Sequence, residues 1–171
     1  MVDGFDLDQE GTLDEQVGPQ CRQRHAAIRE RHDDFGLERQ PGVLQFHGEE
    51  TPEFCRQFAP LKVVKAFRIQ NAASLQPLPD YAVDAWLLDS YVPGHRGGTG
   101  EKFNWELAAQ AKELGRPVIL AGGLSPENIA DAMQQVWPFG VDVSSGVERT
   151  RGEKDPAKIE EFVARVRALQ E

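Results

Sequence analysis

AWLLDSYVPGHRGGTG, residues 85–100, sets the plan of the chain. Its first half is an apolar run that ends in a carboxylate, Asp89, and its second half holds four glycines within seven residues. Such a pattern is typical of a buried strand that leads into an anion-holding loop, because glycines let backbone N–H groups approach a ligand without a Cβ in the way. We therefore expect chemistry at Asp89. The alternative is a strand followed by a flexible surface loop.

The composition restricts the classes of protein to which the chain can belong. With 171 residues it suits one domain, and it is shorter than the roughly 250 residues that a closed barrel of eight βα units usually takes. Hydrophobic residues make up 40% and charged residues 27%, as in globular soluble proteins. A formal net charge of −9 and the lack of a basic stripe argue against nucleic-acid binding.

The N-terminal region differs from the rest of the chain. Residues 1–20 carry six acidic side chains and three glycines without a helical or strand period, so we expect irregular structure there, followed by an amphipathic helix over 21–39. The acidic start does not match a signal peptide, and no apolar run approaches the ~18 residues of a membrane span. We predict a cytoplasmic protein with no membrane partner, divided into residues 1–40 and a βα portion, 41–171.

Neither the two cysteines of the chain nor the two histidines of the predicted helix 21–39 indicate a metal site. Cys21 and Cys55 lie in unrelated contexts without CxxC spacing, which argues against a disulfide framework and a zinc site. His25 and His32 fall on nearly the same face of the predicted helix, but nothing near them completes a ligand set. We predict solvated histidines there and no bound metal.

A repeating plan begins at Gly42. Five short segments are apolar and rich in β-favouring side chains: residues 42–48, 62–69, 84–90, 116–123 and 139–146. Helical stretches separate them, and strands that alternate with helices predict right-handed βαβ crossovers and a parallel sheet covered by helices. In such sheets the functional site lies beyond the carboxyl ends of the strands.

Helix-start signals mark two of the intervening helices. Thr51 is predicted to cap one helix with Pro52 at its first position, and Ser125 with Pro126 repeats the device. Two further helices are predicted over residues 104–114 and 156–169, and 71–79 has room for about two helical turns.

Glycine-bearing turns follow the last two predicted strands. They are AGGLSPEN, residues 121–128, and SSGVE, residues 144–148, and GGTG at 97–100 is placed to close over the same ligand. Backbone N–H groups at such turns hold anions, so the βα portion is predicted to bind phosphate or sulfate. The alternative is that Gly122 and Gly123 merely permit tight packing, which leaves Ser144, Ser145 and Gly146 unexplained.

These residues carry a specific likeness. LQFHGEE, VVKAFRI, LLDSYVPGHRGGTGEKFNW, PVILAGGLSPENI and GVDVSSGVERTRGEKDPAKIEEFV, in this order, resemble phosphoribosylanthranilate isomerases of tryptophan biosynthesis over roughly residues 42–167. The resemblance implies a parallel (β/α)8-barrel (TIM-barrel) type of fold, present here as an incomplete barrel of about five βα units. It also implies an intramolecular oxidoreductase, an aldose–ketose isomerase that rearranges N-(5-phosphoribosyl)anthranilate to 1-(2-carboxyphenylamino)-1-deoxyribulose 5-phosphate without cofactor or metal.

The resemblance also assigns roles to individual residues. Asp89 matches the catalytic aspartate, a general acid that opens the sugar ring and that needs a raised pKa for this task. The expected substrate-binding residues are Gly122, Gly123, Ser144, Ser145 and Gly146 in the two turns, Gly98 and Thr99 in the neighbouring loop, and Gln45, His47 and Arg68 along the cleft. For His47, a structural role beside a neighbouring strand remains an open alternative.

The chain departs from the family pattern in its N-terminal part. The KxCG motif that carries the family's general-base cysteine and the arginine-bearing segment after the second strand do not occur. The alternative is therefore a truncated, catalytically inert homologue that at most binds a phosphate ligand, and a second enzyme alternative is a related barrel such as indoleglycerol-phosphate synthase. Because five strands do not close a barrel, we also expect self-association through open sheet edges.

Overall fold

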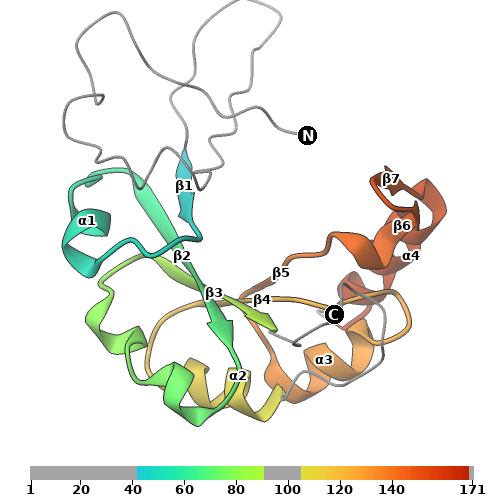
Figure 1. The fold of residues 1–171 in the computed structure, drawn as a ribbon. Coiled ribbons are helices and arrows are strands. Elements are labelled where there is room, and N and C mark those ends of the chain that lie inside the picture. The colour runs from blue at the N-terminus through green and yellow to red at the C-terminus, as the bar shows by residue number, and fades with distance from the viewer. Residues whose placement is uncertain (1–41, 91–104, 170–171) are drawn as a thin grey trace, which may run out of the picture. The chain divides into compact units, whose positions relative to one another are not determined.

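The computed structural model describes residues 42–90 and 105–169, and they form short strands alternating with helices (Figure 1). In chain order the elements are β1 (Val43–Phe46), α1 (Pro52–Arg56), β2 (Lys62–Ile69), the 3-10 helices η2 (Ala72–Leu75) and η3 (Leu78–Asp80), β3 (Ala85–Ser90), α2 (Trp105–Lys112), β4 (Val118–Ala121), α3 (Ile129–Val136), β5 (Gly140–Val141), the 3-10 helix η4 (Ser145–Val147), β6 (Glu148–Thr150), β7 (Glu153–Lys154) and α4 (Pro156–Arg167). All five predicted strands are confirmed, with β1, β4 and β5 shorter than expected. No helix of the described ranges is long and apolar enough to cross a bilayer.

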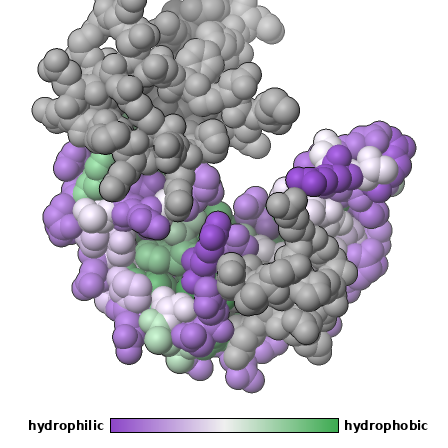
Figure 2. Space-filling model, viewed as in Figure 1, coloured by the Kyte–Doolittle hydropathy of each residue, from purple (hydrophilic) through white to green (hydrophobic). Residues whose placement is uncertain are grey.

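The strands β1 to β5 form one sheet in the order β1-β2-β3-β4-β5. The pairs β1 with β2, β3 with β4, and β4 with β5 are parallel, which confirms the predicted parallel sheet. Figure 2 shows hydrophobic residues gathered where β2 and β3 lie, with hydrophilic residues around them. Within each of these parallel pairs the two strands present their carboxyl ends at the same edge.

The chain divides into two compact units. The described residues of the first unit are 42–66 and 80–84, and those of the second are 67–79, 85–90 and 105–169. The expected boundary near residue 40 and the predicted helix over 21–39 lie outside the described residues, so both stay predictions.

In the first unit an aromatic cluster holds α1 against β1. The ring centroids of Phe46, Phe54 and Phe58 lie 4.9–5.5 Å apart in edge or tilted arrangements, a spacing that stabilises aromatic pairs. The side-chain oxygen of Thr51 accepts a hydrogen bond from the Phe54 N–H at 3.2 Å, and Pro52 opens the helix. The predicted start of this helix is confirmed.

In the second unit α2 and α3 pack together, and α2 packs against β4. Leu88 of β3 and Leu120 of β4 are paired in register and fully buried. The buried residues of α3 recur every three or four positions, at Ile129, Ala132, Met133 and Val136. This spacing gives the helix one apolar face, and α3 packs against α2 and α4.

The predicted cap of α3 is wrong. The helix begins at Ile129 with Asn128 as its N-cap, not at Pro126 with Ser125. The Asn128 side chain explains the difference, because its Oδ1 accepts from the Ser125 N–H and its Nδ2 donates to the Gly123 carbonyl, both at 2.9 Å. These bonds shape residues 123–128 into a turn before the helix starts.

A two-stranded antiparallel hairpin, β6 with β7, was not predicted. Its strands are two or three residues long and polar, so they lack the apolar alternation that signals a strand. Gly152 makes the turn with a φ of 83°. After the hairpin, Asp155 caps α4 by accepting from the Ala157 N–H at 3.0 Å.

Candidate functional site

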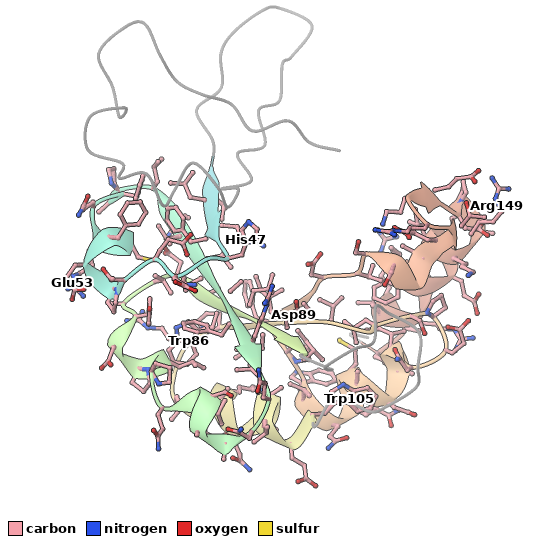
Figure 3. All side chains as sticks on the ribbon, viewed as in Figure 1. His47, Glu53, Trp86, Asp89, Trp105 and Arg149 are labelled. Atoms are coloured by element: carbon pink, nitrogen blue, oxygen red, sulfur yellow. The ribbon has the colours of Figure 1, made fainter. Side chains whose placement is uncertain are left out.

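Asp89 lies beside the first glycine turn at the carboxyl ends of β3 and β4 (Figure 3). Its Cα pairs with that of Ala121, and Gly122 follows directly in the chain. Since the two strands are parallel, Asp89 and Gly122 emerge at the same edge of the sheet. An acid and a glycine turn therefore share one rim, as the sequence led us to expect.

A second carboxylate, Asp142, projects toward the same side. Leu120 pairs with Val141 across β4 and β5, and the Asp142 N–H donates to the Leu120 carbonyl at 2.8 Å. Asp142 thus stands one position beyond this pair, opposite Ala121. Residues opposite one another in adjacent strands point to the same face, so Asp89 and Asp142 flank Ala121 on one face. Sequence reasoning missed Asp142, because the predicted strand 139–146 extends past it, whereas β5 ends at Val141, directly before it.

The surroundings of Asp89 favour its protonated form. Burial raises the pKa of the half-buried Asp89 carboxyl group, and the Asp142 charge raises it further. The positive charge of Arg68, exposed on β2, lowers this pKa but does not cancel the increase. A carboxyl group with a raised pKa retains its proton closer to neutral pH and is able to act as a general acid there.

The turn after β4 is built from two consecutive glycines with left-handed backbone. Gly122 has a φ of 83° and Gly123 a φ of 66°, which other residues rarely adopt. A Cβ added to Gly123 would meet no atom within 4 Å, so the space beside it is open. The Asn128 amide holds the turn from behind through Gly123 and Ser125. Such a turn exposes backbone N–H groups in an arrangement that suits an anion.

The turn after β5 touches the turn after β4. A Cβ built on Gly146 would lie 1.8 Å from the Leu124 carbonyl oxygen and 3.0 Å from the Ser125 Cα. Only a residue without a side chain fits between these backbones. Gly146 therefore brings the two glycine-bearing turns, residues 122–125 and 144–146, into direct contact.

Lys154 adds a positive charge to the second turn, and sequence reasoning missed it. Its Nζ donates to the Ser144 carbonyl at 2.9 Å, lies 3.4 Å from the Ser144 Oγ, and forms an ion pair with Glu148 at 2.9 Å. The hydrogen bond from Lys154 lowers the pKa of the Glu148 carboxyl group, which helps keep the pair ionised. Finding Lys154 required the β6–β7 hairpin, because the lysine lies ten residues after Ser144.

Gln45 and His47 belong to the first unit. Gln45 is half-buried in β1 and pairs in register with Val64, while His47 follows the strand and is exposed. Both lie at the carboxyl end of β1, the end expected to bear the site. The predicted contacts Gly98 and Thr99 lie outside the described residues.

The described part of the chain holds no group of three or more His, Cys, Asp or Glu side chains that could ligate a metal ion. Cys55 is buried inside α1, and burial raises the pKa of its thiol. A buried thiol with a raised pKa is a poor proton acceptor near neutral pH. Cys21, His25 and His32 lie outside the described residues.

A parallel sheet whose strands alternate with helices and carry polar and glycine residues at their carboxyl ends defines an α/β protein of the (β/α)-barrel type. In the described residues this sheet is open, with five strands. The sequence profile of the N-(5'-phosphoribosyl)anthranilate (PRA) isomerase family matches residues 20–165. The chain belongs to this family, which confirms the resemblance seen in the sequence.

Curated relatives support the assignment. The N-(5'-phosphoribosyl)anthranilate isomerase of Geobacter metallireducens is 54% identical over 126 residues, which cover 74% of this chain and 61% of that protein. The isomerase of Trichlorobacter lovleyi is 49% identical over 122 residues, 71% of this chain and 59% of that protein. The chain thus spans about three fifths of the length of the curated relatives it matches.

Solved structures confirm the fold. Phosphoribosylanthranilate isomerase from Thermotoga maritima superimposes with a TM-score of 0.68 at 37% identity, over 75% of this chain and 62% of that one. A phosphoribosylanthranilate isomerase in complex with reduced 1-(o-carboxyphenylamino)-1-deoxyribulose 5-phosphate gives a TM-score of 0.64 at 34% identity, over 75% and 60% of the two chains.

Proposed function

We propose that the chain carries the isomerase chemistry of its family, the rearrangement of N-(5-phosphoribosyl)anthranilate to 1-(2-carboxyphenylamino)-1-deoxyribulose 5-phosphate in tryptophan biosynthesis. This makes it an intramolecular oxidoreductase, an aldose–ketose isomerase, in which carbon 1 of the sugar is reduced and carbon 2 is oxidised. The observation that carries the proposal is the single rim shared by Asp89, with its raised pKa, and two glycine turns in contact. A solved relative that is 34% identical to this chain is in complex with reduced 1-(o-carboxyphenylamino)-1-deoxyribulose 5-phosphate.

Asp89 is the proposed general acid. In the first step the carboxyl proton passes to the ring oxygen, the bond between this oxygen and carbon 1 breaks, and the nitrogen lone pair forms a C=N bond to carbon 1. Loss of the proton on carbon 2 then gives an enolamine, which tautomerises to the aminoketone. The raised pKa of Asp89 supports the first step, because the acid must be protonated when substrate binds.

The two glycine turns are the proposed phosphate site. Backbone N–H groups of Gly122, Gly123, Ser145 and Gly146 donate to the phosphate oxygens, with Ser144 beside them. The contact between Gly146 and the Leu124–Ser125 backbone supports this proposal, because it brings the two sets of donors together. Gly98 and Thr99 remain the expected contacts from the neighbouring loop.

The remaining substrate contacts are proposed on position and charge. Arg68 supplies a cation beside Asp89 and suits an anionic group of the substrate. Gln45 and His47 provide hydrogen-bonding groups at the carboxyl end of β1. The reaction as proposed needs no metal or cofactor, and the cytoplasmic location stays a prediction.

The base that takes the carbon-2 proton is not assigned to a described residue. Cys55 does not fit this task, because it is buried within α1 and its pKa is raised by burial. This makes turnover by the chain itself the decisive measurement.

The test follows loss of fluorescence of the aminoaldose in the presence of the chain. Turnover that Asp89→Asn abolishes supports the proposal, and Asp131→Asn, on the exposed side of α3, is the matched control with full activity. Tight binding of the reduced product without any turnover contradicts the proposal. That result favours the alternative, a homologue that binds a phosphate ligand and does not catalyse.

A further inference from the structure

Among the residues that the structure describes, Lys65 is the one charged side chain in the buried core, with 3% of its surface exposed. It lies in β2 between apolar neighbours, in the segment VVKAF. Lysine is almost never fully buried without a partner, because removing its charge from water is costly. The contacts of Lys65 therefore indicate what its burial achieves.

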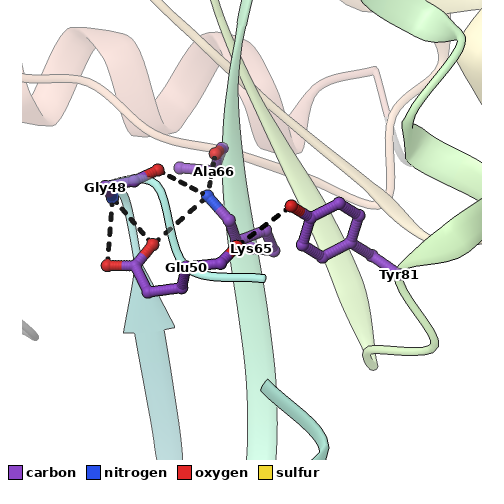
Figure 4. A network of polar contacts seen from close by, with 5 residues as sticks. All are labelled: Gly48, Glu50, Lys65, Ala66 and Tyr81. Atoms are coloured by element: carbon purple, nitrogen blue, oxygen red, sulfur yellow. Dashed lines mark hydrogen bonds and ion pairs between the residues drawn. The ribbon is translucent and has the colours of Figure 1, made fainter. Parts of the chain in front are cut away.

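The ammonium group of Lys65 binds the loop that follows β1 (Figure 4). Its Nζ donates to the Gly48 carbonyl at 3.0 Å and to the Ala66 carbonyl at 2.9 Å, and it lies 3.4 Å from Glu50 Oε2. A lysine has three protons to donate, so these oxygens use its full capacity. Two of the three belong to residues 47–50, which we name the β1–α1 loop.

The same network holds the loop from two further directions. The Glu50 carboxylate accepts from the Gly48 N–H at 2.9 and 3.2 Å. The Tyr81 hydroxyl donates to the Glu50 carbonyl at 3.0 Å, and burial raises the pKa of Tyr81, so this hydroxyl keeps its proton. The Tyr81 ring also lies 5.8 Å from the Lys65 Nζ. The Gly48 carbonyl and the Glu50 carboxylate thus bind Lys65, and the Gly48 N–H binds that same carboxylate. The Glu50 carbonyl binds Tyr81, whose ring lies beside Lys65.

Such a network restricts the loop to one conformation more than it adds to the free energy of unfolding. Buried ion pairs contribute little net stability, since desolvation offsets their attraction, whereas removing one partner leaves the other unpaired. Without the Lys65 charge, the Gly48 carbonyl and the Glu50 carboxylate would turn to water and the loop would rearrange. The residue next to Gly48 is His47, one of the proposed substrate contacts.

We propose that Lys65 is a positioning residue that holds the β1–α1 loop in the conformation that presents His47 to the substrate. The substrate part of this inference rests on the proposed function, whereas the ordering of the loop does not. The test therefore has one arm that needs no ligand and one that does.

The matched pair of variants is Lys65→Met and Lys62→Met. Lys62 lies in the same strand, its side chain is 67% exposed, and it pairs with Asp84 at 2.8 Å. That carboxylate also accepts a hydrogen bond from the Val63 N–H at 2.8 Å. Each lysine thus pairs with a carboxylate that also accepts a backbone N–H, but only the network of Lys65 includes the β1–α1 loop. Glu50→Gln keeps an acceptor for the Gly48 N–H but removes the charge. Its Gly48 amide exchange is expected to lie between those of the wild type and Lys65→Met.

The ligand-free arm measures amide hydrogen exchange of Gly48 by NMR. Lys65→Met is expected to speed this exchange at least about tenfold, the equivalent of one charged hydrogen bond, while amides at the centre of β2 change no more than in Lys62→Met. Gly48 exchange equal in the two variants, with lowered thermal stability in Lys65→Met, would show a purely structural lysine and overturn the proposal.

The ligand arm measures the affinity for reduced 1-(2-carboxyphenylamino)-1-deoxyribulose 5-phosphate by calorimetry. Lys65→Met is expected to weaken binding about tenfold, Lys62→Met not at all, and Lys65→Met in a His47→Ala background no further than His47→Ala alone. Full additivity of the two losses would show that Lys65 does not act through His47 and would refute that part. A wild-type chain that does not bind this compound contradicts the proposed function, and the exchange of Gly48 then decides the role of Lys65.

Discussion

Replacing Gly146 by alanine tests whether contact between the two glycine turns supports both the fold and the proposed phosphate site. The new Cβ would lie 1.8 Å from the Leu124 carbonyl oxygen, whereas real Cβ atoms keep at least 3.0 Å from such neighbours. Since the obstacle is main chain, no side-chain rotation relieves the overlap. The turns at 122–125 and 144–146 must therefore separate by about 1 Å or more.

The energetic cost of this separation is large for one methyl group. Overpacking in a well-packed region costs about 1–3 kcal/mol of the free energy of unfolding. Because two backbone segments must move here, the cost is expected at or above the upper end of this range. For a chain of this length, a loss of about 3 kcal/mol corresponds to a fall in Tm of about 6–12 °C. The matched control is Gly140→Ala in β5, whose Cβ would meet only Ile119 Cγ1 at 3.8 Å, an ordinary contact.

The assay compares both variants with the wild type by thermal unfolding and by affinity for inorganic phosphate. Gly146→Ala is expected to lower Tm by the stated amount and to weaken phosphate binding at least about tenfold, because the two sets of N–H donors no longer converge. Gly140→Ala is expected to stay within about 2 °C of the wild type. Equal Tm and equal phosphate affinity in the two variants would show that the turns do not depend on their contact.

Three further predictions follow from the charges and edges of the sheet. Asp142→Asn removes a charge that raises the Asp89 pKa, so the loss of activity at high pH should begin at lower pH, and Arg68→Gln should move it the opposite way; a pH–rate profile unchanged in both variants refutes this. Asp89 binds its proton more tightly in the folded than in the unfolded chain, so it lowers stability as pH rises above about 4. Asp89→Asn should therefore unfold at higher urea concentration than the wild type at pH 7 and at the same concentration near pH 3, and lower stability at pH 7 contradicts the reasoning. The described part of β1 and of β5 each pairs on one side, so we expect self-association in sedimentation velocity, and a monomer at all concentrations argues against it.

Much of the sheet was accessible to sequence reasoning because its strands are apolar and end in glycines or polar turn residues. The segment 62–69 became β2 with the predicted bounds, and Thr51 with Pro52 marked the start of α1 correctly. The same start signal misled at Ser125, because Asn128 reached back to Gly123 and Ser125. A local sequence pattern does not reveal which of two candidate caps the side-chain bonds will choose.

Other parts of the site depended on residues that are distant in the chain. Asp142 stands opposite Ala121 because of the register of β4 and β5, and Lys154 reaches Ser144 because of a hairpin without apolar alternation. Lys65 in VVKAF had no feature in the sequence that identified its partners, since Gly48 and Tyr81 lie on either side of it at long separations.

By itself the sequence determined the alternation of strands and helices, the parallel sheet, the family, and the acid and glycines at strand ends. These features are local, because hydrophobic period, turn chemistry and motif order are written along the chain. The tertiary structure alone decided that Gly146 touches the Leu124 backbone, that Asp142 adds to the raised pKa of Asp89, and that Lys65 is buried against the β1–α1 loop. The reason is physical: close packing and charge interactions depend on distance in space, which register and packing set only after the chain has folded.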